Sequence, residues 1–250
     1  MKAIRLPLFI GLLVFLLSFL YQIPASFVLS QVEKRFPIQF KQVTGTLWSA
    51  SVEQVHYQGI DLGELNWHFH WLSLLTGKVG ANIHWQDKGF DLQSYVAITL
   101  DQTVLLEDAE LTLDAYWLKK IPKMPANFEG VLSGTMTKIE WQSPAIPLLI
   151  GELDWQKGGV LTPIRIPPGN YHFSLHHHSN QQQIDVSSKE AAVKVSGHLK
   201  LLEDWQYKIN LHLKPTVAVN PGMRQGLTLL GKAQPDGMVV IKKSGNFNKM

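Results

Sequence analysis

Alternation of apolar and polar residues is the feature that most restricts how this chain folds. It covers three stretches, and their apolar members are Phe90, Leu92, Val96, Ile98 and Leu100, then Ala109, Leu111, Leu113 and Ala115, then Tyr207, Ile209, Leu211 and Leu213. Successive side chains of a strand point to opposite faces, so each stretch predicts a strand with one apolar and one polar face. Such two-sided strands are typical of antiparallel sheets.

Turn sequences separate these stretches, among them DKG at 87–89, KGG at 157–159, PPGN at 167–170 and PDG at 235–237. Strands and turns without helical patterns between them favour a mainly β fold. We therefore expect an N-terminal transmembrane helix followed by an elongated antiparallel β-sheet domain.

An internal echo suggests that this domain contains two similar β units. The segment GELNW at 63–67 recurs as GELDW at 151–155, and a G-x-L segment precedes each copy, at 45–47 and 130–132. We predict a first unit at 38–118, a linker at 119–125, a second unit at 126–215, and a short helix with strands at 216–250. The alternative is coincidence, because a five-residue echo is short for a repeat.

The N-terminal segment 6–21, LPLFIGLLVFLLSFLY, contains no charge, and Lys2 and Arg5 precede it. A helix that spans a membrane needs about 20 apolar residues, and the uncharged run continues through residue 29. The sequence thus predicts an anchor at 6–29, formed by Leu6, Leu8, Phe9, Ile10, Leu12, Leu13, Val14, Phe15, Leu16, Leu17, Phe19, Leu20 and Tyr21. Basic residues favour the cytoplasmic side, so residues 1–5 are expected there and the remaining chain across the membrane.

The alternative for this segment is a cleavable signal peptide, whose apolar region runs to roughly 7–15 residues before a site with small residues. The best candidate site, Val28 to Ser30, has Val where a small residue is needed. Length and site both favour a retained anchor. A helical stub at 30–37, ended by Pro37, would follow it.

Composition excludes several function classes. The net charge is +3, with 23 basic and 20 acidic residues, so no electrostatic argument supports a nucleic-acid partner. Cysteine is absent, which excludes disulfides, thiolate metal sites and cysteine nucleophiles.

Neither a G-x-S-x-G nor an H-E-x-x-H motif is present, and the acidic residues fall at turns or on polar strand faces. His172, His176 and His178 share one strand face, but the nearest carboxylate in the sequence, Asp185, follows a polar turn. We expect a solvated strand face there rather than a metal site, and we predict no enzymatic activity and no cofactor.

The aromatic residues allow two interpretations. Trp67, Phe69 and Trp71 have the spacing of one strand face. Core packing is the simpler reading, because each ring buries roughly 150–250 Å². The second is an aromatic groove for lipid or an extended peptide.

Several motifs together resemble one family. VTGTLWSA at 43–50, LNW at 65–67, WLSLLTGKV at 71–79 and GLTLLG at 226–231 follow the N-terminal apolar segment. In this order they resemble the type II secretion system protein N family, also called general secretion pathway protein N. The residues that carry the resemblance are Gly45, Thr46, Leu47, Trp48, Trp67, Trp71 and Gly77.

The resemblance implies a single-pass protein of the bacterial inner membrane with its bulk in the periplasm. It would be a non-catalytic subunit of a machine that exports folded proteins, with other secretion subunits as partners. It also implies kinship with twisted AsmA-type sheets, and hence an alternative role as a lipid-binding module. A continuous apolar trough would favour lipid binding, and a filled core with bare sheet edges would favour docking of partners.

Overall fold

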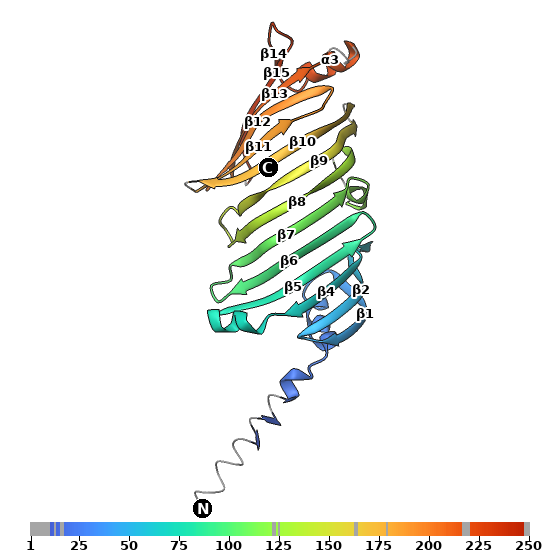
Figure 1. Cartoon of the computed structure of the whole chain (residues 1–250), viewed down its shortest axis with the longest axis vertical. Coiled ribbons are helices and arrows are strands. Elements are labelled where there is room, and N and C mark those ends of the chain that lie inside the picture. Colours follow the sequence, from blue (N-terminus) through green and yellow to red (C-terminus); the bar gives the residue numbers. More distant parts are fainter. Residues whose placement is uncertain are drawn as a thin grey trace, which may run out of the picture.

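A single large antiparallel sheet dominates the computed structural model of this protein (Figure 1). The structure describes residues 11–12, 14–15, 18–121, 124, 126–162, 165–178, 180–216 and 221–247. Within them, the strand order is β1-β2-β4-β5-β6-β7-β8-β9-β10-β11-β12-β13-β15-β14, and β3 pairs with β2. The expectation of a mainly β, antiparallel fold is confirmed.

The first half of the sheet comprises β1 (Ile38–Thr46), β2 (Ser49–Tyr57), β3 (Ile60–Asp61), β4 (Glu64–Phe69), β5 (Lys78–Asp87), β6 (Phe90–Thr99) and β7 (Val104–Asp114). The second half comprises β8 (Asn127–Trp141), β9 (Leu148–Thr162), β10 (Ile166–His178), β11 (Gln181–Ser188), β12 (Val193–Leu202), β13 (Gln206–Pro215), β14 (Lys232–Ala233) and β15 (Val239–Asn246). The helical elements are α2 (Ala25–Glu33), η1 (Trp71–Thr76), η2 (Trp117–Lys120) and α3 (Pro221–Thr228).

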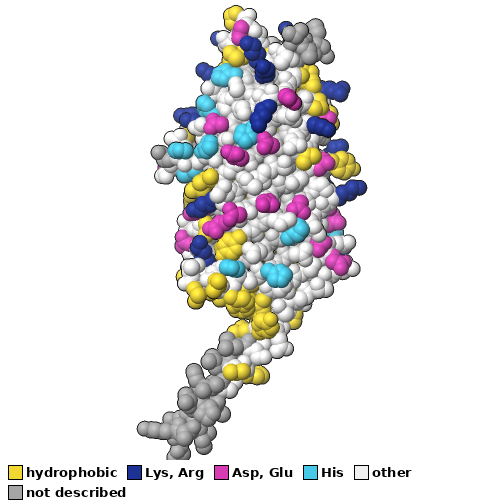
Figure 2. Space-filling view, viewed as in Figure 1, with side chains coloured by type: hydrophobic (Ala, Val, Ile, Leu, Met, Phe, Trp, Pro, Cys, Tyr) yellow, Lys and Arg dark blue, Asp and Glu magenta, His cyan; other side chains and the backbone are white. Residues whose placement is uncertain are grey.

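Strand register gathers the apolar residues on one face of the sheet. Directly paired residues share a face, and the pairs Leu92↔Leu111, Leu113↔Leu132, Leu132↔Trp155, Leu153↔Phe173, Leu175↔Ile184, Leu199↔Ile209 and Leu211↔Ile241 run from β6 to β15. The opposite face carries polar pairs such as Asp91↔Thr112, Thr135↔Glu152 and Ser174↔Asp185. Figure 2 views a surface rich in acidic, basic and histidine side chains.

Two β-bulges keep this apolar face continuous at places where apolar residues no longer alternate strictly with polar ones. Asp108 has a φ of 50°, and the pairing between β6 and β7 shifts by one residue there. As a result, Leu106 and Ala109 lie on one face although three positions separate them. A second shift, between Met136 and Lys138, does the same in β8. Ala109, Met136 and Leu175 form a buried cluster.

The sheet is continuous across the two predicted units, because β7 and β8, which lie on either side of the predicted linker at 119–125, pair directly. Strands β7 and β8 pair from Val104↔Trp141 to Asp114↔Val131. The first echoed segment begins one residue before β4 and the second lies in β9, and the tryptophans that end them make similar hydrogen bonds. Trp67 donates its indole N–H to the Leu47 carbonyl at 2.9 Å, and Trp155 donates to the Glu129 carbonyl at 3.1 Å. The division into two units stays a prediction.

The N-terminal region differs in detail from the expected anchor and stub. Helix α2 begins at Ala25 and ends at Glu33, whereas a stub was expected at 30–37. No helix in the described part of the chain has the length and apolarity needed to cross a membrane. The predicted anchor residues Leu6, Leu8, Phe9, Ile10, Leu13, Leu16 and Leu17 lie outside the described residues. The others, Leu12, Val14, Phe15, Phe19, Leu20 and Tyr21, are 47–65% exposed.

Helix α3 covers the apolar face at the C-terminal end of the sheet. Leu227 of this helix is completely buried against Val193, Leu213 and Val239. Figure 1 places α3 at the end of the long axis opposite β1 and β2. The two ends of the sheet therefore differ, because one carries a helical cover and the other carries the N-terminal segment.

Candidate functional site

The turn between β1 and β2 forms a joint with the N-terminal segment. The Leu47 amide donates a hydrogen bond to the Ile23 carbonyl at 2.9 Å, and Pro24 forms a β-bridge with Thr46. Ala25, at the start of α2, is fully buried. Gly45 permits this turn because it has a φ of 91°, a region that favours glycine.

Three aromatic rings extend the joint. The Trp48 indole N–H donates to the Leu20 carbonyl at 2.9 Å, and its ring lies 4.2 Å from Trp71 and 5.0 Å from Phe69. Trp67 completes the contact through its bond to the Leu47 carbonyl. The rings and hydrogen bonds thus connect the end of the N-terminal segment, the first strands and η1.

The structure therefore brings together six of the seven residues that carried the family resemblance: Gly45, Thr46, Leu47, Trp48, Trp67 and Trp71. The seventh, Gly77, ends η1 with a φ of 71°, and its amide donates to the Leu74 carbonyl. One expectation was wrong, because Trp71 does not continue the strand of Trp67 and Phe69. Strand β4 ends at Phe69, and Trp71 opens η1.

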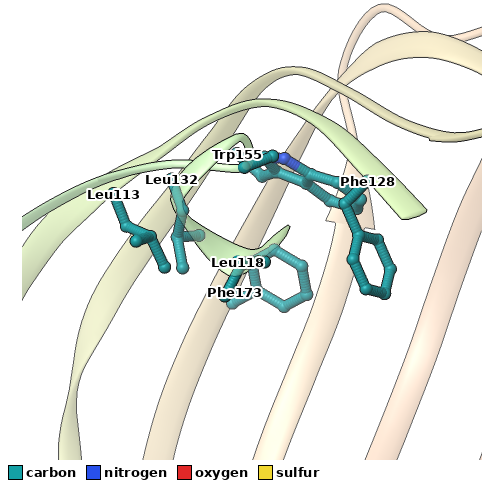
Figure 3. Close-up of a pocket in the computed structure, with 7 residues that line it drawn as sticks. Leu113, Leu118, Phe128, Leu132, Trp155 and Phe173 are labelled. Carbon is teal, nitrogen blue, oxygen red and sulfur yellow. The ribbon is translucent and has the colours of Figure 1, made fainter. Parts of the chain in front are cut away.

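The apolar face holds a hollow of about 180 Å³ near the middle of the sheet (Figure 3). Side chains from β7, β8, β9, β10 and η2 surround it: Leu113, Ala115, Leu118, Phe128, Leu132, Trp155 and Phe173. Every lining side chain is apolar. The hollow can accept a hydrocarbon group, but it offers no acid, base or nucleophile.

Tyr171 lies beside this hollow, with its ring 5.5 Å from that of Trp155. Burial raises the pKa of its hydroxyl. Its hydroxyl oxygen is buried and has no hydrogen-bond partner among the described residues. An unpaired buried polar group costs about 1–3 kcal/mol, so a bound water or ligand group that paired with it would stabilise the site.

The histidine face is closer to carboxylates than the sequence suggested. His172 Nδ1 lies 2.9 Å from Asp154 Oδ1, and His176 Nε2 lies 4.0 Å from Asp185 Oδ2. In the sequence the nearest carboxylate follows a polar turn, but strand pairing places β9 and β11 on either side of β10 and so brings Asp154 and Asp185 beside the histidines. Even so, the described residues contain no group of three or more His, Asp or Glu placed to hold a metal ion.

Comparison with known proteins addresses the family directly. A family model described as type II secretion system (T2SS), protein N, matches residues 37–242. The chain belongs to the type II secretion system protein N family. The match begins one residue before β1 and ends within β15, so it covers nearly the whole sheet of this chain.

Two curated relatives carry the same family name. The chain is 28% identical to "Type II secretion system protein N" of Aeromonas hydrophila over 205 residues, which cover 80% of each chain. It is 26% identical to the protein of that name from Vibrio cholerae serotype O1 over 233 residues, 90% of each chain. No solved structure matches the chain.

Proposed function

We propose that this protein is a non-catalytic, inner-membrane-anchored subunit of the type II secretion system. Residues 1–5 would lie in the cytoplasm and the sheet in the periplasm, where it would support export of folded proteins across the outer membrane. The observation that carries the proposal is the joint at the β1–β2 turn. The residues that resemble the family's motif are those that attach the apolar N-terminal segment to the sheet.

Docking on other secretion subunits is the activity that the family match favours, and the edge of the sheet offers a means for it. Strand β1 lies at one end of the sheet and pairs with β2 on one side only. Its other side carries a bridge from Thr46 to Pro24 and a hydrogen bond from the Phe40 amide to the Glu33 carboxylate, which leave the strand partly open. A free edge offers a row of unpaired N–H and C=O groups to another chain. Such docking needs no catalytic residue.

A second candidate function, lipid binding, is favoured by the apolar face. Its apolar pairs continue from β6 to β15, and the hollow, which Trp155 helps to line, is surrounded by apolar side chains. Exposed apolar surfaces of this kind mark binding sites in soluble domains. A lipid that lay along the sheet would cover it.

Secretion assays in the native bacterium test the first proposal. Deletion of the gene is expected to leave the exported proteins in the periplasm, and the intact chain is expected to restore their release. A chain whose residues 1–19 are replaced by a cleaved signal peptide should not restore it, whereas one with an unrelated single-pass anchor in place of residues 1–19 should, because both keep the joint. Unchanged secretion after deletion would contradict the proposal.

Native mass spectrometry of the purified protein distinguishes lipid binding from docking. Bound phospholipid that disappears in a Trp155→Ala or Phe173→Ala variant would favour lipid binding through the hollow. Protein without lipid, together with lost secretion in the deletion strain, would favour docking alone.

A further inference from the structure

The end of the sheet where the N-terminal segment leaves carries a cluster of exposed apolar side chains. Helix η1 and the turn between β6 and β7 adjoin there, since a Cβ atom on Gly77 would lie 3.8 Å from Leu100 Cδ1. We name this cluster the tip patch. Its members are 47–89% exposed: Leu72, Leu74, Leu75, Val79, Ile98 and Leu100.

Helix η1 buries a polar side chain and exposes apolar ones, which is the reverse of what is usual for a segment surrounded by water. Its polar Ser73 is only 5% exposed, and the hydroxyl of Ser73 lies 2.6 Å from that of Tyr95. Leu72 and Leu75, by contrast, are 65% and 84% exposed. The six residues of η1 include no charge. Contiguous exposed apolar surface of this kind marks a contact with another phase or partner.

The tip patch lies at the same end of the molecule as the N-terminal segment. Figure 1 shows η1, the short helical turn that precedes β5, at the same end of the long axis as β1 and β2, and Figure 2 shows hydrophobic side chains gathered where the segment joins the sheet. The connection is direct, because Trp48 bonds to the Leu20 carbonyl and packs on Trp71, the first residue of η1.

We propose that the tip patch enters the surface layer of the bilayer that holds the N-terminal segment. This inference rests on the proposed function, because it assumes that the segment is anchored. The protein then meets the membrane at two points, the segment and the leucines of η1 and the β6–β7 turn. Two points of contact restrict the tilt of the sheet above the membrane more than a single point of contact does.

The chemistry around the patch suits a lipid surface. Tryptophan indoles and lysine ammonium groups are favoured at the boundary between hydrocarbon and headgroups, and Trp71 and Lys78 flank the leucines at either end of η1. The carboxylate in the β6–β7 turn, on Asp101, accepts hydrogen bonds from the hydroxyls of Thr99 and Thr103. Its charge is therefore partly satisfied within the turn beside Leu100.

Single-cysteine labelling tests this inference, since the chain has no cysteine of its own. Leu75→Cys, Leu100→Cys and the control Leu229→Cys place an NBD fluorophore at positions that are 84%, 89% and 81% exposed. Leu229 follows α3 at the opposite end of the sheet. Each full-length variant is reconstituted into vesicles of phosphatidylethanolamine and phosphatidylglycerol, with circular dichroism to verify its fold.

We expect blue-shifted emission at positions 75 and 100, quenched by lipids that carry a doxyl group near the headgroup, and neither effect at position 229. Flotation of the vesicles separates the two proposals. Protein that floats while all three probes respond alike would overturn the tip patch and leave the anchor intact. A blue shift without doxyl quenching would mean contact with protein, and would also overturn it. Protein that does not float would overturn the anchor and this inference together.

Discussion

Replacement of Gly45 by alanine should loosen the joint between the sheet and the N-terminal segment. A Cβ atom at this position would lie 2.3 Å from the Ser49 carbonyl oxygen and 2.9 Å from the Ala50 Cα. Both are backbone atoms, so the hairpin must shift to relieve the overlap. Gly59 is a matched control, because its φ of 83° is similar but nothing lies within 4 Å of its Cβ position.

Both variants place alanine at positive φ, which costs about 1–2 kcal/mol. Gly45→Ala adds the cost of steric overlap, roughly 1–3 kcal/mol. An excess of about 2 kcal/mol corresponds to a roughly thirtyfold larger opening equilibrium. Hydrogen exchange at the Leu47 amide, which donates to the Ile23 carbonyl, reports this opening. We expect exchange in Gly45→Ala to be about thirtyfold faster than in Gly59→Ala, by the same conversion. Equal protection in the two variants would refute the account of the joint.

Other perturbations probe the apolar face, a partly buried ion pair and metal dependence. Trp155→Ala should lower the free energy of unfolding by about 2–4 kcal/mol, as measured with urea, because it removes a large apolar side chain and enlarges the hollow. The same change at Trp141, which is 43% exposed, should lower it less. Burial disfavours the charged form of Asp87, but hydrogen bonds from Lys120 and Trp117 outweigh it and lower the pKa of its carboxyl. The resulting stabilisation is present above the ordinary pKa of about 3.9 and disappears as the pH falls through the lowered value. The stability difference between wild type and Asp87→Asn should therefore shrink in acid, and a constant difference would contradict this. Removal of divalent metal with a chelator should leave the melting temperature unchanged; a large decrease would reveal a structural ion.

The alternation of residues predicted the strands and the polarity of their two faces. It did not reveal how the faces stay continuous, because the bulge at Asp108 depends on one backbone conformation. Nor did it reveal the partners of His172 and His176, since Asp154 and Asp185 reach them only through strand register.

The joint was visible in the sequence only as a set of motif residues. Trp48 and Leu20 are 28 positions apart, and their hydrogen bond depends on how the N-terminal segment meets the hairpin. The spacing of Trp71 from Trp67 and Phe69 matched that of one strand face, but the strand ends at Phe69 and Trp71 begins η1. Local sequence patterns therefore could not predict the contacts between segments that are distant in the sequence.

The intact mass of the mature protein, taken from the inner-membrane fraction of the native bacterium, tests the central claim most directly. A retained anchor predicts a mass near the 28.2 kDa of the whole chain. A protein shorter by about 30 residues at its N-terminus would show that a signal peptide had been removed. That result would contradict the permanent tether on which the proposed function depends.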